Sequence, residues 1–186
     1  MISSWSASIS RLPVPESAGG PPADLRVRVV GVGNRFRGDD GAGLAAAQRL
    51  GEAANVPVTL LDAIGDGTAL LEVWREVDTV IVLDAMRSGA APGTVRRLGG
   101  AGGTPAAVAA ALGAGRRTGS THGLGVAEAI ALGEALGRLP RRLVVIAIEG
   151  ARFDTGGILS PEVERALDRA VGLGLEEVAH VHRAAR

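Results

Sequence analysis

Two aspartates and one histidine are the residues of this sequence that could bind a divalent cation together. Asp40 follows the glycine turn in "VVGVGNRFRGDDGAG", Asp84 lies near the end of the apolar run "DTVIVLDA", and His122 stands at the start of the helical pattern "THGLGVAEAI". Two carboxylate oxygens and one neutral imidazole nitrogen suit a borderline divalent ion such as nickel, zinc or manganese. We therefore expect one site if the fold brings these three side chains together.

Each candidate residue also has a structural interpretation. Asp39 and Asp40 could both cap the helix that follows them. Capping is the role we expect for Asp39, whereas Asp40, one residue further on, is less needed for a cap and is assigned to the site. Asp84 could instead accept hydrogen bonds from turn amides, and a single histidine such as His122 is often a structural hydrogen-bonding residue.

Other polar residues are weaker candidates. Glu149 ends a buried apolar run, where it could join the site, cap a turn or form a salt bridge. His180 and His182 lie so near the end of the chain that we expect them to be solvent-exposed. The pair Arg116-Arg117 is expected on the solvated surface.

The composition excludes several kinds of chemistry. The 186-residue chain has no cysteine and no tyrosine, and all 20 of its basic residues are arginine. Disulfides, cysteine-bound zinc, iron–sulfur clusters, thiol nucleophiles and lysine bases are therefore absent. Basic and acidic residues balance to a net charge of +0, which gives no sign of a nucleic-acid partner.

The length and the distribution of apolar residues indicate one domain. Residues 1–24, rich in Ser, Pro and Gly, are interpreted as a flexible leader, residues 25–175 as a single α/β domain, and residues 176–186 as a C-terminal tail. The leader has no continuous apolar segment typical of a secretory signal, and no run approaches the roughly 20 residues of a membrane span. We expect a cytoplasmic protein with no membrane partner.

Strand-like and helix-like segments alternate along the domain. Apolar runs predict strands over residues 26–33, 56–63, 78–85, 93–98 and 141–150, the fourth being short and polar enough for a sheet edge. Helical patterns cover residues 40–53, 67–77, 121–139 and 160–178, and the Gly- and Ala-rich segment 99–120 has room for one or two helical turns. This alternation predicts a three-layer α/β/α fold around a mostly parallel sheet of about five strands.

Such a fold positions the candidate site. In an open parallel sheet, ligands bind beyond the carboxyl ends of the strands where the strand order reverses. If the second and third strands flank the first, Asp40 and Asp84 lie at one crevice. His122 near a helix N-terminus would be kept neutral by the helix dipole, which is the form that binds metal.

Four sequence blocks, in this order, resemble the maturation endopeptidases of nickel–iron hydrogenases. They are "GVGNRFRGDDGAG", "GDGTALL", "VLDAMRSGAAPGTV" and "STHGLGVAEAI". A weaker fifth block, "AIEGARFDTGGILSPEVERAL", is similar to the family's closing strand, loop and helix. The resemblance extends from about residue 27 to about residue 170, but Gly150 stands where the family often has proline.

The resemblance implies a function and a partner. It implies a protease that recognises the nickel-loaded precursor of a hydrogenase large subunit and removes its C-terminal extension. The small interaction surface that this reaction needs favours a monomer. The family's metal-contacting positions fall on Asp40, Asp84 and His122, which would also be the catalytic residues. The nickel would be carried by the substrate, so no permanently bound cofactor is expected.

Two alternatives remain open at the level of sequence. Gly31, Gly33 and Asp62 suggest a Rossmann-type nucleotide-binding enzyme, but Phe36 stands in place of the third glycine and the nearby carboxylates would repel a pyrophosphate. The other alternative is a module that docks on a metalloprotein and cleaves nothing.

Overall fold

The computed structural model describes residues 26–62, 68–75, 77–100, 103–113 and 125–184. Within these residues a single five-stranded sheet has the order β2-β1-β3-β5-β4. Its strands are β1 (Val27–Gly33), β2 (Val58–Asp62), β3 (Thr79–Met86), β4 (Val95–Gly99) and β5 (Arg142–Glu149). All neighbours are parallel except β4, which runs antiparallel to β5 at the edge. The predicted mostly parallel sheet and its polar edge strand are confirmed.

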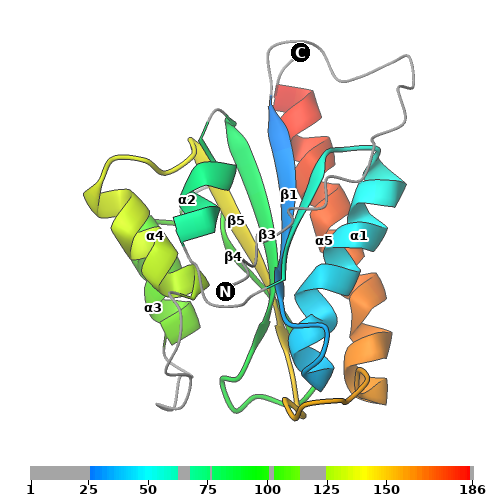
Figure 1. The fold of residues 1–186 in the computed structure, drawn as a ribbon. Coiled ribbons are helices and arrows are strands. Elements are labelled where there is room, and N and C mark those ends of the chain that lie inside the picture. Colours follow the sequence, from blue (N-terminus) through cyan, green and yellow to red (C-terminus); the bar gives the residue numbers. More distant parts are fainter. Residues whose placement is uncertain (1–25, 63–67, 76, 101–102, 114–124, 185–186) are drawn as a thin grey trace, which may run out of the picture.

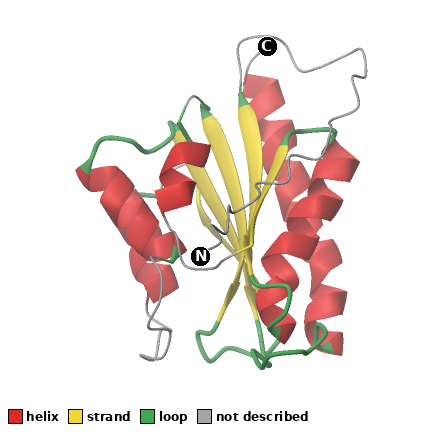
Figure 2. Ribbon diagram, viewed as in Figure 1, coloured by secondary structure: helices red, strands yellow, loops and turns green. Residues whose placement is uncertain are grey.

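Helices cover both faces of the sheet and make three layers (Figure 1). One face carries α1 (Ala42–Ala54) and α5 (Pro161–Ala184), and the other carries α2 (Thr68–Val73), α3 (Pro105–Gly113) and α4 (Val126–Ala135). A short 3₁₀ helix, η1 (Gly38–Gly41), leads directly into α1. The loops that follow β1, β3 and β5 gather at one end of the sheet, the lower end in Figure 2.

The core consists of two apolar clusters, one on each face of the sheet. Val29, Ile81 and Ile146 point toward α1 and α5, whereas their neighbours Val30 and Val145 point toward the other three helices. Because the central strands are buried on both faces, their sequences are almost continuous apolar runs rather than alternating ones.

The start of α1 lies directly on the carboxyl ends of β1 and β3. A Cβ atom added to Gly43 would collide with the carbonyl oxygens of Val32 and Leu83 and would lie 2.9 Å from Cα of Asp84. Only a residue without a side chain permits this approach. Gly43 therefore allows η1 and the first turn of α1 to reach the end of the sheet where ligands are expected.

The prediction of a C-terminal tail over residues 176–186 is wrong over most of its length. α5 continues to Ala184, and Glu177, Val178 and Val181 are buried. The helix persists because its apolar face continues to pack on the sheet and α1 beyond the expected end. The predicted leader, residues 1–24, lies outside the described residues, and no helix in the described part is long and apolar enough to cross a membrane.

Candidate active site

The segments that carry Asp40 and Asp84 are in contact. Asp40 lies on η1, and η1 packs against both β1 and β3. Asp84 is the sixth residue of the eight-residue strand β3, and the first turn of α1 approaches its backbone at Gly43. Since β2 and β3 flank β1, which was the condition for the crevice, both carboxylates belong to the loops and strand ends around it.

The third predicted residue, His122, lies outside the described residues, as does the pair Arg116-Arg117. Among the described residues, no group of three or more His, Cys, Asp or Glu side chains is arranged to hold a metal ion. Only two members of the predicted triad, Asp40 and Asp84, belong to that part of the chain. The three-residue site therefore stays a prediction.

Asp40 is a partly buried carboxylate in a tight backbone turn. Its N–H donates to the carbonyl oxygen of Arg37 at 3.2 Å, and its own carbonyl oxygen accepts from the N–H of Asn34 at 3.1 Å. Burial raises the pKa of its side chain, the guanidinium of Arg37 lowers it, and Asp62 raises it further, so that the net pKa lies above the ordinary value. A carboxylate whose charge is disfavoured in this way gains from a bound cation.

Asp39, next to this carboxylate, has a different role from the predicted helix cap. Neither η1 nor α1 receives a side-chain capping bond. Instead the fully buried carboxylate accepts hydrogen bonds from the N–H groups of Ala151 (2.8 Å), Arg152 (2.9 Å) and Ser160 (2.6 Å) and from the Ser160 hydroxyl (3.0 Å). Asp39 thus ties η1 to the loop between β5 and α5.

These hydrogen bonds keep Asp39 ionised. Burial alone would raise the pKa of its carboxyl group, but the N–H groups of Ser160, Arg152 and Ala151 and the Ser160 hydroxyl outweigh burial and lower the pKa. Ser160 immediately precedes α5, as predicted, and Pro161 is the first residue of that helix. The partners of Asp39 are more than 100 residues away in sequence, and no local pattern indicates them.

Glu149 caps a turn, one of the three roles considered for it. Its side chain is buried and accepts hydrogen bonds from the N–H of Ser88 (2.8 and 3.0 Å), the Ser88 hydroxyl (2.7 Å) and the N–H of Gly89 (2.9 Å). Because residues 88 and 89 follow the end of β3, this carboxylate fixes the loop that begins just beyond Asp84.

The arrangement around the first glycine turn does not suit a pyrophosphate. A Cβ on Gly33 would collide with the carbonyl oxygen of Asp40, so η1 folds back onto the turn and puts a carbonyl oxygen there. Asp62, which would bind a ribose in a dinucleotide enzyme, forms a 2.6 Å ion pair with Arg35. These contacts at Gly33 and Asp62 argue against a nucleotide site.

Two histidines near the end of α5 are separate from this region. His180 is exposed, as expected, whereas His182 is only partly exposed and its Nε2 atom is buried without a hydrogen-bond partner. The prediction of a solvent-exposed side chain is therefore wrong for the Nε2 end of His182, because the helix around it continues instead of fraying. Neither histidine belongs to the carboxyl end of the sheet.

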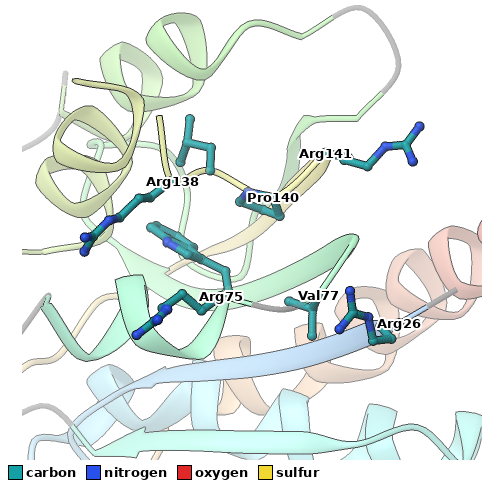
Figure 3. Close-up of a pocket in the computed structure, with 8 residues that line it drawn as sticks. Arg26, Arg75, Val77, Arg138, Pro140 and Arg141 are labelled. Atoms are coloured by element: carbon teal, nitrogen blue, oxygen red, sulfur yellow. The ribbon is translucent and has the colours of Figure 1, made fainter. Parts of the chain in front are cut away.

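A cavity of about 370 Å³ lies at the other end of the sheet. It is lined by Arg26, Trp74, Arg75, Val77, Arg138, Leu139, Pro140 and Arg141 (Figure 3). Arg26 and Arg141 immediately precede β1 and β5, and Val77 lies two residues before β3, so the cavity opens at the amino ends of the strands. Figure 3 shows Arg141 pointing away from Arg75 and Arg138, so the guanidinium groups do not converge on one point. We do not assign the candidate site to this cavity.

The fold and the carboxylates define an α/β protein with acidic residues at the carboxyl ends of a doubly covered sheet. Residues 45–177 match the family model described as hydrogenase maturation protease. This match covers more than half of the chain. The chain therefore belongs to the hydrogenase maturation protease family, and its activity is that of an endopeptidase.

Relatives and solved structures agree with this assignment. The chain is 31% identical over 167 residues to the hydrogenase expression/formation protein HupD of Thiocapsa roseopersicina, covering 88% of this chain and 72% of the relative. The match to HupD of Rhodobacter capsulatus is 32% over 156 residues, covering 82% and 71%.

Two solved structures have the same fold. The maturating endopeptidase HybD of E. coli superposes with a TM-score of 0.60 at 26% identity, covering 87% of this chain and 94% of that one. The maturation protease HybD of Thermococcus kodakarensis superposes with a TM-score of 0.61 at 27% identity, covering 83% and 99%.

Proposed function

We propose that this protease removes the C-terminal extension from the nickel-loaded precursor of a nickel–iron hydrogenase large subunit. Membership of the maturation protease family supports the reaction class. The observation that carries the site assignment is the packing of η1, with Asp40, against β3, with Asp84. We further propose that the enzyme acts as a monomer in the cytoplasm.

In this proposal Asp40, Asp84 and His122 bind the nickel ion that the substrate carries. Two oxygens and one nitrogen leave coordination positions for the substrate's own ligands. Because the ion is already attached to the precursor, its capture holds the scissile peptide bond beside the carboxylates and supplies proximity. Nickel is thus a recognition feature of the substrate rather than a resident cofactor.

Hydrolysis then needs a polarised carbonyl group and an activated water molecule. The water oxygen adds to the scissile carbonyl carbon, the C–N bond breaks, and the leaving nitrogen takes up a proton. The nickel ion that the substrate carries would polarise the carbonyl, and the ion or a carboxylate of the site would activate the water. A covalent intermediate is not required, and the chain has no cysteine to form a thioester.

Mass spectrometry of the precursor tests this function directly. Purified protein is incubated with nickel-loaded and with nickel-free precursor, and the mass of the large subunit is followed. We expect shortening of the nickel-loaded form only. Equal cleavage of both forms would refute recognition through nickel, and cleavage of neither would refute the activity.

Variants test the three residues separately. Asp40→Asn, Asp84→Asn and His122→Gln are each expected to abolish shortening, whereas Asp154→Asn, at an exposed loop position, should retain it. If the protein were only a docking module, it would form a complex with the precursor without shortening it, even after long incubation.

A further inference from the structure

Two large apolar side chains are exposed beside the candidate active site. Among the described residues, the exposed large hydrophobics are Phe36 (66%), Leu136 (51%), Ile158 (84%) and Leu175 (37%). Phe36 lies between β1 and η1, and Ile158 lies between β5 and α5, so both belong to loops at the carboxyl end of the sheet. Leu136 and Leu175 lie on or next to helices elsewhere.

The loops that carry Phe36 and Ile158 are in direct backbone contact. The N–H of Gly156 donates to the carbonyl oxygen of Phe36 at 2.7 Å. A Cβ on Gly38 would lie 2.8 Å from the carbonyl oxygen of Arg152 and 3.7 Å from that of Ile158. The two loops therefore form one continuous surface, although they are more than 100 residues apart in sequence.

Hydrogen bonds to the side chains of Asp39 and Asn34 order the same loops. The carboxylate of Asp39 binds Ala151, Arg152 and Ser160, at the two ends of the second loop. In the first loop, the side-chain oxygen of Asn34 accepts a 2.9 Å hydrogen bond from the N–H of Phe36. A surface ordered in advance loses less conformational entropy when a partner binds.

Two arginines beside Phe36 are paired within the chain, whereas Arg152 and Asp154 are exposed in the loop that carries Ile158. Arg35 pairs with Asp62 at 2.6 Å, and Arg37 lies 3.7 Å from Asp40. Since exposed ion pairs contribute little to binding, a partner here gains more from apolar contact with Phe36 and Ile158. Exposed apolar side chains at such a position are typical of a protein-binding surface.

We propose that Phe36 and Ile158 bind an apolar stretch of the precursor's polypeptide chain next to the scissile bond. This inference rests on the proposed function, because it takes the precursor as the substrate of the adjacent site. Phe36 is four residues before Asp40, and Arg37, next to Phe36, contacts the Asp40 carboxylate. A peptide segment crossing these two side chains would thus enter the site at η1.

The test compares serine substitutions at the two positions with one at a distant exposed leucine. Phe36→Ser, Ile158→Ser and the double variant are compared with Leu136→Ser, which alters a similarly exposed side chain next to α4. Steady-state cleavage of nickel-loaded precursor gives KM and kcat, and calorimetric titration of the same precursor gives Kd. Loss of one buried apolar contact predicts a rise of roughly tenfold in Kd and KM for each single variant, with little change in kcat.

The outcomes separate this inference from the proposed function. If the wild type binds the precursor but does not cut it, the function is refuted. The Kd values then still test the docking surface, which is formed by Phe36 and Ile158. If the wild type cuts and all variants keep wild-type Kd and KM, the docking surface is refuted and the function stands. An equal loss of affinity in Leu136→Ser would also refute the docking surface, because the effect would not be specific to the loops that carry Phe36 and Ile158.

Discussion

The buried carboxylate of Asp39 accepts hydrogen bonds from both the N–H and the hydroxyl group of Ser160, 121 residues further along the chain. This contact joins η1 to the start of α5. Since η1 also carries Asp40, the position of that carboxylate depends on a residue that does not itself face a substrate. Asp39 is in this sense a positioning residue for the proposed active site.

Asp39→Asn should lower both stability and activity. The amide keeps the shape of the carboxylate but places an NH₂ group against N–H donors, which leaves buried donors unsatisfied. We expect a loss of about 3 kcal/mol in the free energy of unfolding. Urea denaturation measures this loss, and precursor cleavage should show a lower kcat because η1 is less well held. Unchanged stability would contradict the buried hydrogen-bonded carboxylate described here.

Glu177→Gln provides the matched control for that variant. The side chain of Glu177 is 3% exposed and binds the guanidinium groups of Arg97 at 2.7 Å and Arg142 at 2.6 Å. Its substitution should also cost about 3 kcal/mol, since two arginines lose a buried partner. Glu177 is far along α5 from Ser160, so kcat for the folded variant should equal that of the wild type. A comparable loss of kcat would mean that general destabilisation, not the position of Asp40, lowers activity in Asp39→Asn.

The pH dependence of stability should report the lowered pKa of Asp39. An unfolded aspartate has a pKa of about 3.9, and hydrogen bonds lower the pKa in the folded protein. The unfolded state therefore binds the proton at higher pH. The stabilisation is fully present above the unfolded pKa and is lost as pH falls through the folded pKa.

The lowered pKa of Asp39 predicts a difference in pH dependence between the wild type and Asp39→Asn. From about pH 5 to about pH 3, the free energy of unfolding should fall more steeply for the wild type than for Asp39→Asn. Urea denaturation at several pH values measures both slopes in the metal-free protein. Parallel slopes would show that Asp39 has the same pKa in the folded and unfolded states.

The sheet could be predicted because its signals are local. Runs such as "DTVIVLDA" and "RRLVVIAIEG" are apolar on both faces, which is typical of central parallel strands, and they fall on β3 and β5. The polar run around Arg96 and Arg97 indicated an edge strand, which β4 is. The order of β2, β1 and β3 was not predicted but was only the condition for a crevice between Asp40 and Asp84, and the sheet meets that condition.

The site could be predicted only in part because its supporting contacts are not local. The position of Asp40 follows from the glycine turn, but the role of Asp39 depends on Ala151, Arg152 and Ser160, which no spacing rule connects to it. A helix cap was the expected role because Asp before a helical pattern commonly has it. The extent of α5 was also missed, since burial of Val181 against the core, not helix propensity, sustains its last turns.

Glu149→Gln tests the second buried carboxylate near the site. The substitution removes one of the two acceptor oxygens that bind Ser88 and Gly89 in the loop after β3. We expect a loss of about 2 kcal/mol in the free energy of unfolding, with lower cleavage activity because the loop begins beside Asp84. Ser88→Ala, which removes only the hydroxyl donor, should cost about 1 kcal/mol. A larger effect for Ser88→Ala than for Glu149→Gln would contradict this account of the loop.

Two glycine-to-alanine substitutions should change stability in opposite directions. Alanine favours a helix over glycine by about 1 kcal/mol, so propensity alone predicts stabilisation at both Gly43 in α1 and Gly172 in α5. At Gly172 nothing lies within 4 Å of the added Cβ, and Gly172→Ala should gain up to about 1 kcal/mol. At Gly43 the Cβ meets backbone oxygens of Val32 and Leu83, so Gly43→Ala should lose about 2 kcal/mol or more as α1 is displaced from the strand ends.

Activity distinguishes the two glycine variants as well. Displacement of α1 in Gly43→Ala carries η1 and Asp40 away from Asp84, so precursor cleavage should fall by more than tenfold while Gly172→Ala cleaves like the wild type. Thermal unfolding followed by circular dichroism measures stability, and mass spectrometry of the precursor measures cleavage. Stabilisation by Gly43→Ala with full activity would mean that α1 does not lie against the ends of β1 and β3. That result would contradict the packing that brings Asp40 and Asp84 to one edge of the sheet.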